Sequence, residues 1–353
     1  MPQKLTLEKI GKLAGVSRST VSRVVNGQPD VKADVRERVL KVVQDTGFVP
    51  NPAARSLAAQ RSGILGFVIP RSVATFFGDP YFARLTQGLT QACNVRGYML
   101  SLFLFHSKND EELLLPRLSE SSFLDGVIVQ ATTDDDPIIP QLQKGRLPFL
   151  VVGRLNTMPE SLSYIDVDNV SGAYKAVEHL IKLGHERIAH ITGSLDNSAG
   201  ADRLTGYKKA LAAHNLPIDE NLIVNGDFTE EGGREAIPKL LPHHPDAIFT
   251  GSDTMAVGAI HALKNAGLQI PDDIAIVGFD DLPPVHLADV PLTTIRQPIL
   301  RFGISAIDVL SDIVEKGSEP PRQALYDTEL IIRESCGAKL KVLPERSKEE
   351  VLP

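Results

Sequence analysis

The side chains with the clearest chemistry lie near the start of the chain, in the stretch GVSRSTVSRVVNG at residues 15–27. Two arginines and four small hydroxyl residues surround a stripe of valines there: Arg18, Arg23, Ser17, Ser19, Thr20 and Ser22. A guanidinium group can donate two hydrogen bonds to one guanine, and hydroxyl groups bond phosphates or bases. The stretch therefore suits contact with a nucleic acid, although an ordinary amphipathic surface helix would share this composition.

A second group of polar and aromatic residues follows expected strands or opens expected helices farther along the chain. Its members are Tyr81 and Phe82 in DPYF, Arg154 after PFLVVG, Arg203 in RLTGY, Phe228 in NGDF, Ser252 after IFTG and Asp280 in GFDD. Carboxylates accept hydrogen bonds from hydroxyl groups, guanidinium groups donate to ring oxygens, and aromatic rings stack on an apolar sugar face. The group suits a polyhydroxylated small molecule. Salt bridges between lobes, or core positions, are the alternative for some members.

Motifs for metal or nucleotide chemistry fail on spacing. HERIAH at residues 185–190 resembles the zincin motif H-E-x-x-H, but its histidines are five positions apart and do not share one helical face. His243 and His244 have no third ligand suggested nearby, and no phosphate-binding glycine loop is found. Cys93 and Cys336 form neither a metal pattern nor a disulfide framework, which fits a reducing cytosol. We expect no enzyme activity, no metal and no cofactor.

Charge is divided unevenly along the chain. Residues 1–61 carry eleven Lys or Arg and five Asp or Glu, whereas the whole chain of 353 residues has a net charge of −7. A small basic head on an acidic remainder indicates that only the head meets a polyanion such as DNA. The first 15 residues are charged throughout, so we expect no secretory signal and no membrane span, and a cytoplasmic location.

Three short helices are expected to position the first stretch. Thr6 caps the first helix, whose apolar face is predicted to be Leu7, Ile10, Leu13 and Ala14. Ser17 caps the second helix, which buries three valines and stops at Asn26-Gly27, and a third helix runs from about residue 32 to residue 46. This is the helix-turn-helix plan, in which the start of the second helix faces the bases. A helical bundle without DNA affinity is the alternative.

The sequence TLEKIGKLAGVSRSTVSRVVNG, followed by RERVLKVVQDTGFVPNPAARSL, resembles the head of the lac repressor and purine repressor family of bacterial transcription regulators. The resemblance extends over residues 5–335. It implies that two hinge helices pair in the minor groove, where Leu57 wedges into a base step and Ala54 allows close approach. Residues 52–59 are too few for a stable isolated helix, so we expect DNA to order them. Packing of Leu57 against the body is the alternative.

The predicted DNA-binding residues combine these arguments. They are Thr6, Leu7, Ser17, Arg18, Ser19, Thr20, Ser22, Arg23, Asn26, Asn51, Ala54 and Leu57. The resemblance also implies that the aromatic, arginine and aspartate positions of the second group line an effector pocket. Arg154 and Asn197 stand where members of the family vary.

Beyond residue 64, short apolar runs alternate with helical stretches, which is typical of parallel sheets covered by helices on both faces. Expected strands are ILGFVI, YMLSLFL, DGVIVQ, PFLVV, RIAHIT, AIFTG and IAIVGF; expected helices include 82–94, 170–183, 203–214 and 255–266. More than 270 residues exceed one usual core, so we expect two lobes. A ligand would bind in the cleft between them, at the carboxyl ends of the strands.

The expected fold is α/β, with a three-helix helix-turn-helix head, a hinge helix and a two-lobed body with parallel sheets, similar to periplasmic binding proteins. The head is expected at 1–50, the hinge at 51–61, the body at 62–338 and a disordered tail at 339–353. One lobe is expected to hold about 62–162 plus 293–324, and the other 163–292 plus 325–338. The tail lacks leucine heptads, so no tetramerising coiled coil is expected.

These observations predict a cytoplasmic DNA-binding transcription regulator, a homodimeric repressor that binds a pseudo-palindromic operator and responds to a sugar or sugar derivative. A solute-binding protein would share the two lobes but would need an export signal and no basic head. An α/β enzyme using nucleotides would need a phosphate loop. Repression and activation, and an inducing and a corepressing effector, are not separated by the sequence.

Overall fold

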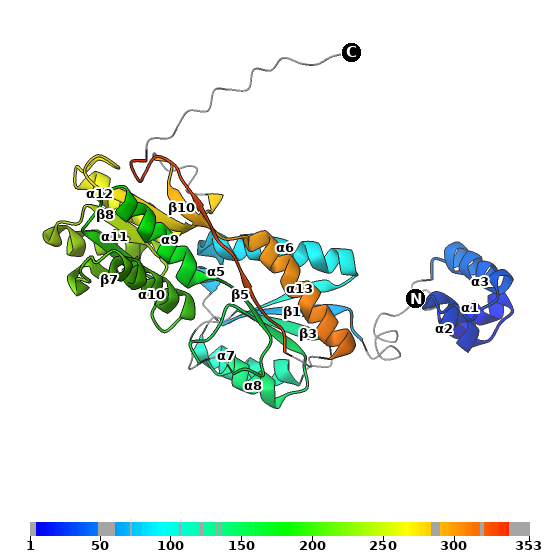
Figure 1. The fold of residues 1–353 in the computed structure, drawn as a ribbon. Helices are drawn as coiled ribbons and strands as arrows, with labels where there is room; N and C mark the ends of the chain where they lie inside the picture. Colours follow the sequence, from blue (N-terminus) through cyan, green and yellow to red (C-terminus); the bar gives the residue numbers. More distant parts are fainter. Residues whose placement is uncertain are drawn as a thin grey trace, which may run out of the picture. The chain divides into compact units, whose positions relative to one another are not determined.

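The computed structural model describes residues 5–48, 61–70, 73–105, 107–120, 123–130, 133, 136–157, 159–283, 290–317 and 321–338. They fall into two compact units, a head that contains the first three helices and a body that contains nearly all residues from Ile64 onward (Figure 1). The predicted hinge contacts Asn51, Ala54 and Leu57 lie outside the described residues, as does the tail at 339–353.

The helices of the head begin and end where the sequence predicts. They are α1 (Leu7–Ala14), α2 (Arg18–Val25) and α3 (Ala33–Thr46). The Thr6 hydroxyl accepts a hydrogen bond from the backbone N–H of Lys9 at 3.3 Å, and the Ser17 hydroxyl accepts one from Thr20 at 3.1 Å. Gly15 adopts φ 65°, the left-handed conformation that glycine tolerates best, and this turns the chain from α1 into α2.

The core of the head is small and rich in valine. Its buried members are Ile10, Ala14, Val21, Val24, Val39 and Phe48. Leu7 packs against this core only in part, and the prediction that Leu13 is buried is wrong, because 57% of its surface is exposed. Successive helical residues are turned by about 100°, which leaves Leu13 about 60° beyond Ile10 at the edge of the apolar stripe.

The first sheet of the body has the strand order β11-β5-β4-β3-β1-β2, and every described pairing in it is parallel. Its strands are β1 (Ile64–Ile69), β2 (Met99–Leu104), β3 (Gly126–Gln130), β4 (Phe149–Val152), β5 (Tyr164–Val167) and β11 (Gln323–Tyr326). Figure 1 shows one pair of helices on each face: α6 (Pro80–Arg96) with α13 (Ile299–Lys316), and α7 (Lys108–Ser119) with α8 (Ile138–Lys144). The short helix α5 (Val73–Gly78) precedes α6.

The second sheet has the order β12-β10-β9-β8-β6-β7, parallel except where β12 pairs antiparallel with β10. Its strands are β6 (Ile188–Thr192), β7 (Ile223–Asn225), β8 (Ala247–Thr250), β9 (Ala275–Asp280), β10 (Thr293–Arg296) and β12 (Glu329–Ile331). The helices are α9 (Asn169–Lys182), α10 (Ser198–Ala213), α11 (Glu230–Leu240) and α12 (Asp253–Asn265), with single turns η1 (Glu220–Leu222) and η2 (Leu241–His243).

Alternate residues of the second sheet serve two separate cores. Ile276 packs with the layer of α11 and α12, whereas its neighbour Val277 packs with α9 and α10. Both kinds of position are apolar, so the strands read as continuous apolar runs, as expected for a sheet covered on both faces. The predicted pattern of parallel strands and covering helices is therefore confirmed.

The boundaries expected for the two lobes need correction. The expected boundary at 163 places β5 in the second lobe, but β5 belongs to the first sheet. The expected boundary at 293 places β10 in the first lobe, but β10 belongs to the second sheet. The chain therefore passes between the lobes after Val167, after Arg296 and after Tyr326. Within the described residues, no helix has both the length and the apolar character needed to cross a membrane.

Candidate functional site

One face of α2 is polar and exposed, opposite the buried Val21 and Val24. Most of the predicted DNA contacts of the head lie on α2 or at its caps, whereas Thr6 and Leu7 lie at the start of α1. Arg18, Ser19, Arg23 and Asn26 are exposed, while Thr20 and Ser22 are half-buried. The Ser17 hydroxyl lies 2.8 Å from that of Ser19 and 2.9 Å from that of Thr20, so the start of α2 carries a cluster of hydroxyl groups.

The two arginines of α2 differ in their surroundings. Arg23 lies 3.4 Å from the carboxylate of Asp30, and both side chains are more than half exposed. Such exposed pairs contribute at most about 1 kcal/mol, so a phosphate or base can displace Asp30. Arg18 stands at the first position of the helix, where its guanidinium extends from the end that a helix-turn-helix presents to bases.

A pocket opens in the body at the carboxyl ends of both sheets. All seven residues of the second predicted group line it, namely Tyr81, Phe82, Arg154, Arg203, Phe228, Ser252 and Asp280. The structure therefore brings them together from segments up to 199 positions apart. Asn197 also lines the pocket, as do several residues that the sequence analysis did not select: Asp79, Gln130, Asp166, Asn169, Ser198, Asp227, Thr229, Gln297 and Phe302.

Arg203 lies at the centre of the second lobe's side of this pocket and is only 5% exposed. Its Nε donates to the side-chain oxygen of Asn169 at 2.9 Å, and its Nη1 donates to the carbonyl oxygen of Gly251. The guanidinium carbon lies 3.7 Å from the ring centroid of Phe279. Each of these contacts offsets part of the cost of burying the cation.

Asp280 pairs with this arginine across 3.7 Å and accepts a hydrogen bond from the side-chain amide of Gln297 at 2.5 Å. Its backbone has φ 121°, which is rare for a residue with a side chain. Burial raises the pKa of Asp280, and the neighbouring carboxylate of Asp253 is buried as well, with its pKa also raised by burial and by Asp280. The pocket thus concentrates carboxylate charge around one arginine.

Asp253 stabilises the segment of Asp280 and Asp281, both of which have positive φ angles. Its carboxylate accepts from the Thr294 hydroxyl at 2.6 Å and from the backbone N–H of Leu282 at 2.9 Å. The second strained residue, Asp281 with φ 58°, is bonded by both Arg296 and Arg333 at 2.7 Å. Strain of this kind persists only where the surroundings fix it, and it concentrates at functional sites.

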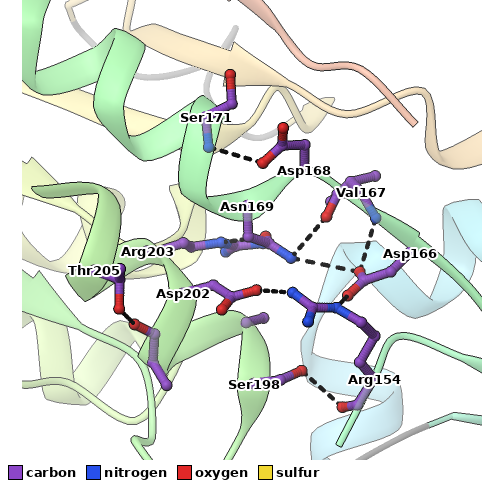
Figure 2. Close-up of polar contacts among 12 residues, drawn as sticks. Arg154, Asp166, Val167, Asp168, Asn169, Ser171, Ser198, Asp202, Arg203 and Thr205 are labelled. Atoms are coloured by element: carbon purple, nitrogen blue, oxygen red, sulfur yellow. Dashed lines mark hydrogen bonds and ion pairs between the residues drawn. The ribbon is translucent and has the colours of Figure 1, made fainter. Parts of the chain in front are cut away.

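Arg154 links the two lobes (Figure 2). Its Nε donates to Asp166 in β5 at 3.0 Å, and its Nη2 reaches Asp202 in α10. The Ser198 hydroxyl, at the start of α10, donates to the carbonyl oxygen of Arg154 at 2.7 Å. Because β5 belongs to the first sheet and α10 packs on the second, this guanidinium spans the cleft.

The burial of Asp166 has a measurable consequence. Burial raises the pKa of this carboxyl to about 6, against the lowering effect of Arg154 and the backbone of Val167. Because the folded-state pKa exceeds the unfolded one, the folded protein binds the proton more tightly, and Asp166 stabilises it more as the pH falls through 6. From pH 7 to pH 5, the unfolding free energy of the wild type should rise by about 1 kcal/mol relative to Asp166→Asn.

Urea unfolding of both proteins at pH 5, 6 and 7 measures this difference. His190, whose pKa burial lowers to about 4, works in the opposite direction, but it is present in both proteins and cancels. A difference between the two proteins that does not vary with pH would mean that Asp166 stays charged from pH 7 to pH 5 in the folded state, so that burial does not raise its pKa.

The histidines of HERIAH lie in different environments. His185 pairs with Asp246 at 3.6 Å, whereas His190 is buried in β6 with its ring stacked between Tyr207 and Phe249. His190 Nδ1 lies 2.9 Å from the carbonyl oxygen of Phe249. Within the described ranges, no three His, Cys, Asp or Glu side chains gather in a way that could hold a metal ion.

Two family models together match nearly the whole chain. Residues 6–51 match the bacterial regulatory proteins of the lacI family, and residues 62–334 match the periplasmic binding proteins and sugar binding domain of the LacI family. The chain belongs to the LacI family of bacterial regulatory proteins. The predicted family and fold class are thereby confirmed.

Relatives of this LacI-family chain are similar along its length. The HTH-type transcriptional regulator CelR of Thermobifida fusca is 36% identical over 333 residues, which cover 94% of this chain and 98% of that protein. A solved CelR–cellobiose complex matches with a TM-score of 0.75 at 35% identity, over 94% of this chain and 99% of that one. The solved lac repressor dimer bound to operator and the anti-inducer ONPF matches with a TM-score of 0.82 at 27% identity. This match covers 95% of this chain and 100% of that one.

The family explains the division of the molecule. The LacI-family chain is a transcription regulator with a helix-turn-helix head and a body of the sugar-binding type. Its curated relatives are transcriptional regulators rather than enzymes. The exposed polar face of α2 lies in the head, and the polar pocket lies in the body.

Proposed function

We propose that this LacI-family regulator is a cytoplasmic homodimeric repressor without enzyme activity, whose affinity for a pseudo-palindromic operator is controlled by a neutral sugar. The observation that carries the proposal is the pocket that joins buried carboxylates, two guanidinium groups and aromatic rings at the cleft of the body. An effector that binds two arrangements of the lobes with different affinity shifts the equilibrium between them.

The pocket has the groups that bind a sugar ring on its edge and on its face. Asp280 can accept hydrogen bonds from neighbouring hydroxyl groups, and Arg203 can donate to a ring oxygen. Tyr81, Phe82 and Phe228 supply aromatic surface for the apolar face of the ring. We assign the effector contacts to the seven predicted residues together with Asp166 and Asn169.

The charges favour a neutral sugar over a phosphorylated or acidic one. Arg203 is already engaged by Asp280, Asn169 and Gly251, and Arg154 by two carboxylates. Tyr81 shares the pocket with Asp79, Asp166 and Asp280. Burial and these three carboxylates raise the pKa of its hydroxyl, against the lowering effect of Arg203. Among the described residues that line the pocket, the cations are Arg154 and Arg203, and both are already paired, so a phosphate would be repelled by these carboxylates.

Similar proteins support the proposal that this chain binds a sugar, operator DNA and a second copy of itself. CelR has been solved with cellobiose, and the lac repressor has been solved as a dimer on its operator. For the present chain we assign DNA contact to the predicted head residues from Thr6 to Asn26, with base recognition by Arg18 and Arg23. The predicted hinge residues Asn51, Ala54 and Leu57 complete that assignment.

Calorimetry of the full chain against a sugar panel tests the proposed ligand class. The panel pairs neutral probes with anionic counterparts: cellobiose, maltose, ribose and glucose, against glucose 6-phosphate, ribose 5-phosphate and glucuronate. At least one neutral sugar should bind, and any matched anion should bind at least about tenfold more weakly, a difference of about 1.4 kcal/mol. An anionic member that binds more tightly than every neutral one would contradict the proposal.

A further inference from the structure

Phe228 is held in a backbone conformation that a bulky residue rarely adopts. It has φ 58°, and the preceding Asp227 has φ 49°. Hydrogen bonds fix the loop around them: the Asp227 N–H donates to the Asn225 side chain at 2.9 Å, and the Thr229 N–H donates to the carbonyl oxygen of Gly226 at 3.0 Å. The loop therefore determines where the Phe228 side chain leaves the backbone.

The ring of Phe228 occupies the space that a side chain at position 193 would need. Gly193 directly follows β6, and a β-carbon placed on it would lie 1.9 Å from Cζ of Phe228, 2.1 Å from Cε2 and 2.4 Å from Cε1. No two carbon atoms can approach so closely without a covalent bond. The φ angle of Gly193 lies outside the left-handed region, so its backbone would accept alanine. The three heavy atoms nearest to such a β-carbon all belong to the ring.

The ring also forms part of the pocket wall. Phe228 lines the pocket, and the guanidinium carbon of Arg203 lies 5.7 Å from its ring centroid. The ring thus lies next to both Gly193 and the charged group at the centre of the pocket. Any movement away from position 193 changes the aromatic surface offered to a ligand beside Arg203.

We propose that Gly193 is a positioning residue of the effector pocket, which by lacking a side chain admits the Phe228 ring against the end of β6 and keeps it in place as an aromatic wall. A methyl group at position 193 displaces the ring by side-chain rotation, because the loop bonds hold the backbone of residues 225–229. The position of the ring rests on geometry alone, whereas its effect on sugar affinity rests on the proposed function.

The displacement can be measured without a ligand. The chain has no tryptophan, so Phe228→Trp introduces a single fluorescent reporter at the wall. Adding Gly193→Ala to this variant should shift the emission maximum and change acrylamide quenching. Gly78→Ala is the matched control, because a β-carbon there meets no atom within 4 Å, and it should change neither. Identical emission and quenching with and without Gly193→Ala would overturn the proposal.

Affinity for cellobiose, the probe suggested by the CelR complex, gives a second readout. Gly193→Ala should weaken cellobiose binding at least tenfold in the wild-type background and leave it unchanged in a Phe228→Ala background, with the urea midpoint of the body little altered. Equal weakening in both backgrounds would contradict a role through the ring. If cellobiose does not bind the wild type, the neutral sugar of the panel that binds takes its place, and the tryptophan measurement decides the role of Gly193 in either case.

Discussion

Arg203→Met is expected to lower the free energy of unfolding of the body by about 3–5 kcal/mol. Methionine fills much of the volume but removes the cation that faces Asp280 and stacks on Phe279. Asp280 is then a buried carboxylate without its paired guanidinium, and Asn169 and Gly251 lose their donor. The same variant should no longer bind a sugar.

Urea unfolding at pH 7 measures this loss of stability. Two further variants show whether the loss comes from the unpaired charge of Asp280. Arg203→Met with Asp280→Asn should lose less stability than Arg203→Met alone, because the second change removes the uncompensated charge. Arg296→Met removes a side chain that is 47% exposed and should cost about 1 kcal/mol or less. If Arg203→Met unfolds at the same urea concentration as the wild type, Asp280 does not depend on this arginine.

Arg18→Ala should weaken binding to a specific operator by about 1–3 kcal/mol more than it weakens binding to random DNA. The reason is its place at the exposed first position of α2, where a guanidinium can bond base edges. Arg23→Ala should have a smaller effect, because the wild-type side chain must first leave Asp30. Asp30→Ala should therefore strengthen binding to both kinds of DNA.

Fluorescence anisotropy with an operator selected in vitro, against a scrambled duplex and over a range of salt, measures these differences. Arg38→Ala is the matched control, because Arg38 is exposed on α3 rather than on α2. It should leave the ratio of specific to random binding unchanged. Equal losses on both duplexes for Arg18→Ala would show that this arginine contacts phosphates alone.

The long strands and helices could be predicted from the sequence because each has enough residues to show a period. The strand ILGFVI became β1 without change, and the predicted caps Thr6 and Ser17 are observed. Two strands of four residues, β4 and β8, were predicted because their residues are almost all apolar. The strands β5, β7 and β10 were missed, because each is short and interrupted by polar residues, so no pattern separates it from a loop. The lobe boundaries failed for the same reason.

Three of the missed pocket residues follow from the missed strands. Asp166 lies in β5, Asn169 lies two residues after it, and Gln297 directly follows β10. Residues at the carboxyl ends of parallel strands are the natural candidates for a cleft, but this rule applies only to strands that have been recognised. Arg203 was found because of its place in RLTGY, yet its pairing with Asp280 depends on how β9 and α10 pack, which the sequence does not specify.

Linkage between sugar and operator binding in the full chain tests the proposed regulation most directly. The affinity of the protein for a neutral sugar is measured with and without saturating operator. Its affinity for the operator is then measured with and without the same sugar at saturation. Both affinities should change by the same factor, at least about fivefold, and Asp280→Asn should remove the change while the operator affinity of the sugar-free protein persists. A sugar that binds in the pocket and leaves operator affinity unchanged would contradict the proposed regulation.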